Sequence, residues 1–153
     1  MKIADLLSDR VVIPELQAEG KAEALDEMTQ VLADATPGID RARLREVLED
    51  RERLGSTGIG GGVAIPHARL PGLSGILAVF GRSSRGVDFD AVDGAPTRLF
   101  FLLVAPEDSS GMHLKALARI ARLLKEQTVR EQLLACDDRD GLLRIIREAE
   151  AKY

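Results

Sequence analysis

Apolar residues recur at helical spacing in several parts of the chain. Between residues 21 and 35 they follow one another at intervals of three and four positions, and Pro37 with Gly38 ends the segment. Asp40 is suited to cap the next helix, because its carboxylate can accept a hydrogen bond from a free N–H group of the first turn. The first two predicted helices span residues 3–7 and 21–35, and a third runs from Asp40 to the residues before Gly55. A fourth begins at Ser109 or Ser110, and two more cover residues 129–135 and 141–151.

Four short apolar segments predict β-strands, and they lie at residues 11–13, 63–65, 76–80 and 99–104. The last is apolar at every position, so we expect a central strand that is buried on both faces. Helices are predicted on both sides of these strands in the sequence. The pattern therefore favours an α/β fold, a three-layer-like sandwich with a small mixed sheet flanked by helices. The chain length predicts a single domain over residues 1–153.

Composition and charge argue against several classes of function. The formal net charge is -4, which argues against a nucleic-acid partner and against an anionic membrane surface. The longest apolar run, residues 99–105, is too short for a membrane-spanning helix, so no membrane insertion is expected. The N-terminal segment carries charges where a signal peptide would be apolar, and the single cysteine, Cys136, fits a reducing compartment. We therefore expect a soluble, cytoplasmic protein.

The segment from Gly55 to Arg69 concentrates the candidate chemistry. It places His67 at the end of a short apolar strand, behind a loop that contains five glycines. Pro66 has no N–H and cannot continue a central ladder, so the strand is expected to end there, with His67 facing outward at its terminus. Imidazole can act as a neutral nucleophile near pH 7, and exposed N–H groups of the glycine loop can receive an anion such as phosphate. The alternative is a plain turn beside a surface histidine.

His113 and Arg51 are the other candidate site residues. His113 lies in the first turn of its predicted helix, where the N-terminus favours a nearby anion, but it could equally be a packed histidine with a local hydrogen bond. Arg51 continues the inward-facing apolar line of its helix. Its guanidinium can reach over the glycine loop to a phosphate, or it can lie along the surface and cap the helix end. Arg53 lies off that line and is expected to be solvated.

Other kinds of site are poorly supported by the spacing of the residues. The glycine loop lacks the Gly-Lys-Ser/Thr of a Walker A motif, and a strand rather than a helix follows it, which argues against a dinucleotide fingerprint. A metal site made of the two histidines with Glu107 or Asp108 has no short ligand spacing. A serine hydrolase would need a Gly-x-Ser-x-Gly turn, which the chain lacks. No nucleotide, metal or other cofactor is therefore expected.

Three segments of the chain resemble one known family. Residues 51–60 read Arg-Glu-Arg-Leu-Gly-Ser-Thr-Gly-Ile-Gly, residues 63–67 read Val-Ala-Ile-Pro-His, and residues 111–114 read Gly-Met-His-Leu. They are similar to the phosphorylation-site and second-histidine segments of the fructose/mannitol-type enzyme IIA domains of the bacterial phosphotransferase system, and most similar to its stand-alone, nitrogen-related branch. The chain departs from the family at Gly61, where asparagine is frequent, and at Ala68-Arg69, where glycine-lysine is frequent.

The resemblance implies the α/β sandwich fold and a phosphohistidine at His67, supported by His113 and Arg51. It also implies that N–H groups near Ser56 and Thr57 help to hold the phosphoryl oxygens. For transfer, His67 must be neutral, with one ring nitrogen free to attack and the other donating to a backbone carbonyl. The protein is then an enzyme, a phosphotransferase component. It needs neither cofactor nor metal, because the energy resides in the donor's P–N bond.

The resemblance also implies protein partners on both sides of the transfer. A histidine phosphocarrier protein is the donor, and enzyme IIB or a regulatory target protein is the acceptor. Because both must reach the histidine, the site should be open with an apolar rim, for which Leu54, Ile59 and Leu70 are candidates. Two roles remain open: a relay to the enzyme IIB of a sugar transporter, and a regulatory module whose phosphorylation state controls protein binding without a sugar acceptor.

Overall fold

The strand predicted from the continuous apolar run is the central strand of the sheet. The computed structural model describes residues 2–152, and six strands within this range form one mixed sheet. They are β1 Val12–Ile13, β2 Gly58–Gly60, β3 Val63–Ala64, β4 His67–Leu70, β5 Leu77–Val87 and β6 Thr97–Pro106. The order is β1-β5-β6-β3-β2, and β4 also pairs with β6. All residues of β6 except Arg98 are buried, as the apolar run predicts.

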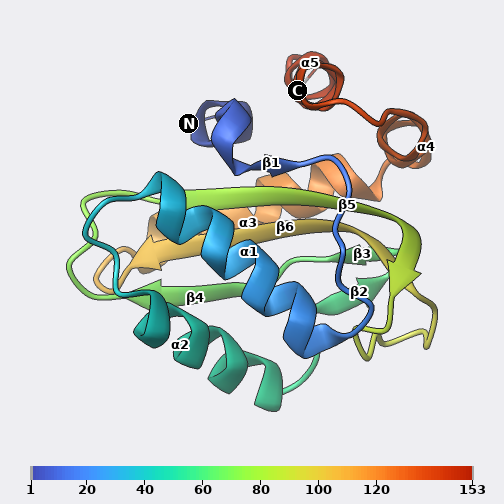
Figure 1. The fold of residues 1–153 in the computed structure, drawn as a ribbon. Helices are drawn as coiled ribbons and strands as arrows, with labels where there is room; N and C mark the ends of the chain where they lie inside the picture. Colours follow the sequence, from blue (N-terminus) through green and yellow to red (C-terminus); the bar gives the residue numbers. More distant parts are fainter. Residues whose placement is uncertain (1, 153) are drawn as a thin grey trace.

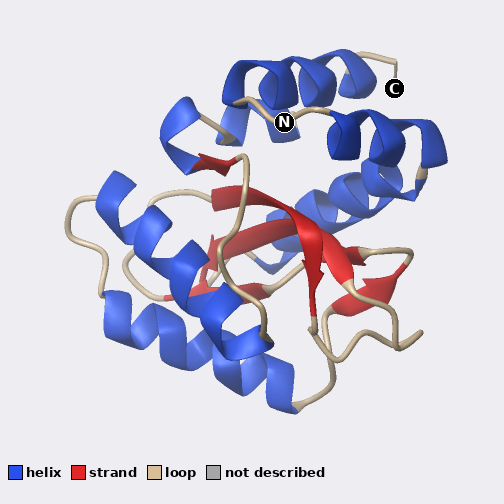
Figure 2. Ribbon diagram, turned by 45° about the vertical axis from the view of Figure 1, so that its right-hand side comes forward, coloured by secondary structure: helices blue, strands red, loops and turns tan. Residues whose placement is uncertain are grey.

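Helices cover both faces of this sheet and make three layers, as Figures 1 and 2 show. They are the 3-10 turns η1 Ile3–Leu6 and η2 Asp9–Val11 and the helices α1 Lys21–Ala35, α2 Arg41–Arg53, α3 Ser110–Lys125, α4 Gln127–Ala135 and α5 Arg139–Glu150. On one face α1 contacts β5 and α2 contacts β4, whereas α3 contacts β6 from the other face. α5 packs against α4 and η1, so the two ends of the chain lie close together.

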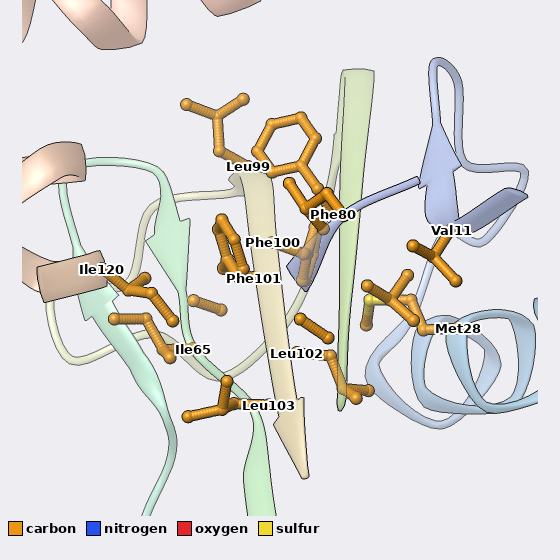
Figure 3. Close-up of a cluster of buried hydrophobic side chains, with 14 of the residues drawn as sticks. Val11, Met28, Ile65, Phe80, Leu99, Phe100, Phe101, Leu102, Leu103 and Ile120 are labelled. Carbon is orange, nitrogen blue, oxygen red and sulfur yellow. The ribbon is translucent and has the colours of Figure 1, made fainter. Parts of the chain in front are cut away.

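The core lies on both sides of β6 (Figure 3). Ile120 of α3 and Ile65 lie on one side of β6, whereas Met28 of α1 and Val11 lie on the opposite side, beyond β5. All four side chains are buried, and full burial of a side chain of this size contributes about 1.5–3 kcal/mol. Because helices cover both faces of the sheet and nearly every residue of β6 is buried, a strand without polar alternation is stable at this place.

The predicted helices are confirmed within one or two residues at most ends, and the strands differ more. Asp40 caps α2 as predicted, because its side chain accepts a hydrogen bond from the N–H of Arg43 at 3.0 Å. The strand predicted over residues 76–80 continues to Val87. Its polar extension is tolerated because Arg82, although buried, donates to the carbonyl oxygens at the end of α4, for example that of Leu134 at 2.6 Å. The segment predicted as a short helix at residues 3–7 forms the 3-10 turn η1.

Glu150, the last residue of α5, joins the two ends of the chain. Its carboxylate accepts hydrogen bonds from the N–H groups of Ile3 at 2.6 Å and Ala4 at 2.9 Å. It also forms an ion pair with Arg119 of α3, with Nη2 and Oε2 at 3.1 Å, although its side chain is only 2% exposed. The buried carboxylate therefore has partners on η1 and α3, and it ties the outer layer of helices together.

Candidate active site

Pro66 shapes the backbone that carries His67. The strand β3 ends before Pro66, as predicted, but the chain resumes its parallel pairing with β6 directly afterwards as β4. The register is kept, because Ala64 pairs with Phe100 and His67 pairs with Leu103. The carbonyl of Pro66 accepts the N–H of Leu103 at 2.9 Å, so the missing proline N–H interrupts the ladder only locally. His67 is therefore the half-buried first residue of a new strand, β4, and not, as predicted, the residue at which the preceding strand ends.

The ring of His67 is held in one orientation and one tautomer. Its Nδ1 lies 2.8 Å from the carbonyl oxygen of Ile65, which can only accept, so Nδ1 carries the proton and donates it. Its Nε2 lies 3.4 Å from Nε of Arg51, whose N–H can only donate, so Nε2 carries the lone pair. Burial lowers the pKa of His67, and the charge of Arg51 acts in the same direction although the Ile65 carbonyl opposes it. This is the neutral form required of a nucleophile.

Arg51 is fixed between the end of α2 and the loop that follows. Its Nη1 donates to the carbonyl oxygen of Gly55 at 2.9 Å, while its Nε reaches His67. The inward-facing line of α2 therefore continues to this arginine, as predicted. Arg53 instead has a side chain that is 69% exposed and pairs with Asp50 of the same helix at 3.0 Å. Of these two arginines, only Arg51 belongs to the site.

His113 lies beside His67 at the start of α3. The ring centroids are 5.5 Å apart, and the rings meet edge to face at 73°. His113 is only 5% exposed, and its Nδ1 accepts the Nε–H of Arg69 at 3.3 Å. Its Nε2 is buried, and no residue between 2 and 152 offers it an acceptor. Burial is the main cause that lowers the pKa of His113 to about 4, with smaller contributions from His67 and Arg69, so this ring is neutral at pH 7.

His67, His113 and Arg51 line one pocket with a volume of ≈ 380 Å³. Two exposed leucines also line it, namely Leu54, 84% exposed, and Leu114, 64% exposed. The pocket thus has polar groups that can meet an anion and apolar edges that can meet a protein. It lies between the end of α2, the start of β4 and the start of α3, which brings together residues far apart in the sequence.

The predicted rim is only partly correct. Leu54 lines the pocket, and Ile59 is exposed at 51% without lining it. Leu70 is wrong as a rim residue, because it is 3% exposed. The reason is the alternation along β4, which turns Ala68 and Leu70 into the core and leaves the other two residues of the strand toward solvent.

Ser56 and Thr57, predicted to bind phosphate, hold the loop instead and do not line the pocket. Thr57 is buried, and both its N–H and its hydroxyl donate to the carboxylate of Glu52, which also pairs with Lys21 at 2.9 Å. The hydroxyl of Ser56 donates to the carbonyl oxygen of Phe89 at 2.9 Å. The N–H of Thr57 and both hydroxyls therefore have partners within the protein, and phosphate binding near these two residues stays a prediction.

The glycine loop also has a structural role, because its backbone groups bond within the protein. Its middle residues form β2, which pairs with β3, and the N–H of Gly61 donates to Asp93 at 3.1 Å. Gly60, Gly61 and Gly62 all have positive φ values between 65° and 92°, a conformation that glycine adopts at low cost. The loop thus makes a tight turn, and the pocket beside His67 is built from side chains.

Sequence reasoning missed two residues that organise the site. Arg69 holds His113, and its position two residues after His67 on a strand is the signal that it shares a face with that histidine. Glu52 holds the loop after α2 through Thr57, and nothing in the local pattern distinguishes it from the solvated acidic residues of the same helix. Within residues 2–152, no three histidine, cysteine or acidic side chains are grouped so that they could hold a metal ion, and no helix is long and apolar enough to cross a membrane.

Comparison with known proteins identifies the family of the chain. The family described as "Phosphoenolpyruvate-dependent sugar phosphotransferase system, EIIA 2" matches residues 5–149. The nitrogen regulatory protein of Bradyrhizobium diazoefficiens is 44% identical over 146 residues, which cover 95% of this chain and 95% of that protein. The fructose-specific EIIABC component of Bacillus subtilis is 38% identical over 148 residues, which cover 97% of this chain but only 23% of that protein.

A solved structure agrees with these sequence relatives. The crystal structure of the nitrogen regulatory protein IIA-Ntr from Neisseria meningitidis has a TM-score of 0.88 to this chain at 33% sequence identity, and the match covers 94% of this chain and 98% of that one. The fold, a mixed sheet between helical layers, is therefore that of a phosphotransferase-system IIA protein. The chain belongs to the EIIA 2 family of the phosphoenolpyruvate-dependent sugar phosphotransferase system, whose members are phosphoryl carriers.

Proposed function

We propose that this protein carries a phosphoryl group on Nε2 of His67. The group is taken from the phosphohistidine of a histidine phosphocarrier protein and is passed to an enzyme IIB or to a regulatory target protein. The observation that supports this most directly is the tautomer of His67, because Nδ1–H is bound to the Ile65 carbonyl and the lone pair of Nε2 faces Arg51. A neutral imidazole with its lone pair directed into an open pocket is a nucleophile that needs no further activation.

The phosphoryl transfer needs no added acid or base, because one N–P bond forms as another breaks. The lone pair of His67 Nε2 forms the new N–P bond, while the bond from phosphorus to the donor's ring nitrogen breaks and leaves its electron pair on that nitrogen. The proton on Nδ1 of His67 stays in place, bound to the Ile65 carbonyl. Because such a transfer has a loose, in-line transition state, the protein contributes by positioning the groups and by stabilising the spread negative charge.

Arg51 and His113 supply that stabilisation in the proposal. Arg51 is held at one end by the Gly55 carbonyl, so its guanidinium is already beside the nitrogen that receives the phosphoryl group. It can exchange its contact with His67 Nε2 for contacts with phosphoryl oxygens, which guanidinium binds well. His113 carries a buried Nε2–H without an acceptor, next to His67, and a phosphoryl oxygen would satisfy it.

The experiment that tests this proposal follows the mass of the protein. The chain is incubated with phosphoenolpyruvate, enzyme I and the histidine phosphocarrier protein, and its intact mass is measured before and after brief acid treatment. We expect one acid-labile phosphoryl group on the wild-type protein and none on His67→Ala. Uptake of acid-labile phosphate by His67→Ala would refute the assignment.

The identity of the acceptor is a separate question. The relatives include a nitrogen regulatory protein and a fructose-specific EIIABC component, and no finding favours a regulatory module that lacks a phosphoryl acceptor. We therefore propose a relay with onward transfer. Adding purified enzyme IIB to the phosphorylated protein should lower its mass by one phosphoryl group, on a timescale on which the phosphorylated protein without enzyme IIB keeps the group. Retention of the group would count against enzyme IIB as the acceptor.

A further inference from the structure

Two arginines each contact one of the two histidines, and they select opposite tautomers. Arg51 donates to Nε2 of His67, and Arg69 donates to Nδ1 of His113. His67 therefore keeps its lone pair on Nε2, whereas His113 keeps its proton on Nε2. The ring of His67 therefore offers a nucleophile that can accept the phosphoryl group, and the ring of His113 offers a hydrogen-bond donor to a phosphoryl oxygen. This complementarity is what a transferring phosphoryl group requires from two neighbouring rings.

Arg69 excludes the other protonation states of His113. A proton on Nδ1 would face the Nε–H of Arg69, so that two donors would point at each other across 3.3 Å. This disfavours both the Nδ1–H tautomer and the imidazolium, which carries protons on both nitrogens. The charge of Arg69 and the burial of the ring both act in the same direction, because each lowers the pKa of His113.

The strand that carries His67 also sets the position of Arg69. The two residues are the first and third of β4, so they emerge on the same side of the sheet. Each is registered on β6, opposite Leu103 and Ala105 respectively, which fixes their spacing. Arg69 lines the same pocket as both histidines. A single rigid strand therefore presents the nucleophile and the group that orients its neighbour.

We infer that Arg69 is a positioning residue, which holds His113 as the Nε2–H tautomer so that this N–H can meet the phosphoryl group on His67. The inference rests on the proposed function for the transfer step, but the tautomer itself is independent of it. Removing a residue that orients a metal-bound histidine typically lowers activity about 10- to 100-fold, and we expect a loss of the same order here. The loss should appear in the transfer rate and not in the affinity for the donor protein, because Arg69 acts through His113.

The test compares Arg69→Met with a matched control, Arg53→Met. Both substitutions remove one positive charge, but Arg53 is exposed, pairs within its own helix and does not line the pocket. Nitrogen-15 NMR of the histidine rings reports the tautomer of His113, and rapid-quench kinetics reports phosphoryl transfer. We expect Nε2–H alone in the wild type and in Arg53→Met, and a mixture of tautomers with transfer slowed about 10- to 100-fold in Arg69→Met.

A conservative variant and the control separate the outcomes. Arg69→Lys retains a cationic donor, so it should keep the Nε2–H tautomer and transfer faster than Arg69→Met. If His113 stays entirely Nε2–H in a folded Arg69→Met, or if Arg53→Met slows transfer equally, the inference is overturned. Wild-type protein that takes up no phosphate from its donor would instead refute the proposed function, whereas the NMR spectra still decide whether Arg69 sets the tautomer.

Discussion

Replacing His113 by alanine tests whether its buried N–H serves the reaction or only the fold. The ring is 5% exposed, so the substitution removes packing as well as a hydrogen-bond donor. It also removes a buried Nε2–H that has no acceptor within the described residues, and this deletion offsets part of the lost packing. We expect a folded variant whose free energy of unfolding falls by about 1 kcal/mol.

The effect on the rate should be much larger than the effect on stability. Deleting one preorganised donor to a developing charge typically costs a factor of about 100 to 1,000 in rate, or about 2.7–4 kcal/mol. Docking of the donor protein depends on a wider surface that includes Leu54 and Leu114, so its affinity should change by no more than about twofold. The two measurements should therefore separate by about two orders of magnitude.

Two further variants make the prediction specific to one ring nitrogen. His113→Gln can place an amide N–H near the position of Nε2 and should recover part of the rate. His113→Asn places its amide near the position of Nδ1 and should transfer as slowly as His113→Ala. Stopped-flow transfer rates and calorimetric affinities for the unphosphorylated donor protein are measured on all three. Equal losses of rate and affinity would show that His113 is only a structural residue, and equal rates for the glutamine and asparagine variants would contradict a specific role of its Nε2.

Two further predictions concern stability. Because the pKa of His113 falls from 6.5 to about 4 on folding, His113 binds a proton in the unfolded chain but not in the folded protein between pH 6.5 and about pH 4. The free energy of unfolding should therefore fall as the pH drops below about 6.5, by up to about 1.4 kcal/mol per pH unit. Urea unfolding at pH 7 and pH 5 should show a larger loss of stability for the wild type than for His113→Ala, and equal losses would contradict this. Glu150→Ala should lower the free energy of unfolding by about 3 kcal/mol, which is the low end for breaking a buried pair because Arg119 keeps access to water. Glu148→Ala, on the exposed face of α5, should change it little, and similar urea midpoints for the two variants would show that the contacts of Glu150 with η1 and α3 do not stabilise the fold.

Features set by local pattern were predictable from the sequence. The run at residues 99–104 is apolar throughout, which occurs in strands covered on both faces, and β6 is such a strand. His67 and Arg51 could be named as candidates for a similar reason, because a proline beside a histidine and an arginine on an apolar helix line are both visible without the fold. The tautomer of His67 was also expected, and its hydrogen bond to the Ile65 carbonyl agrees with that expectation.

Features set by contacts between distant segments were not predictable. Arg69 meets His113 across 44 positions of sequence, and no local pattern pairs them. Pro66 was read as the end of a strand, which hid β4 and with it the inward direction of Leu70. Thr57 was assigned to phosphate by resemblance to the family, and the sequence does not show that the carboxylate of Glu52 accepts both of its donors.

The central claim is that Nε2 of His67 carries the phosphoryl group, and the nitrogen bound to phosphorus can be observed directly. The protein is labelled with nitrogen-15, phosphorylated by its donor protein and studied by nitrogen-15 and phosphorus-31 NMR. Because Nδ1–H is committed to the Ile65 carbonyl, the phosphorus coupling should appear on Nε2 of His67, and Nδ1 should keep its proton. Phosphorus bound to Nδ1 of His67, or to any other residue, would contradict the account.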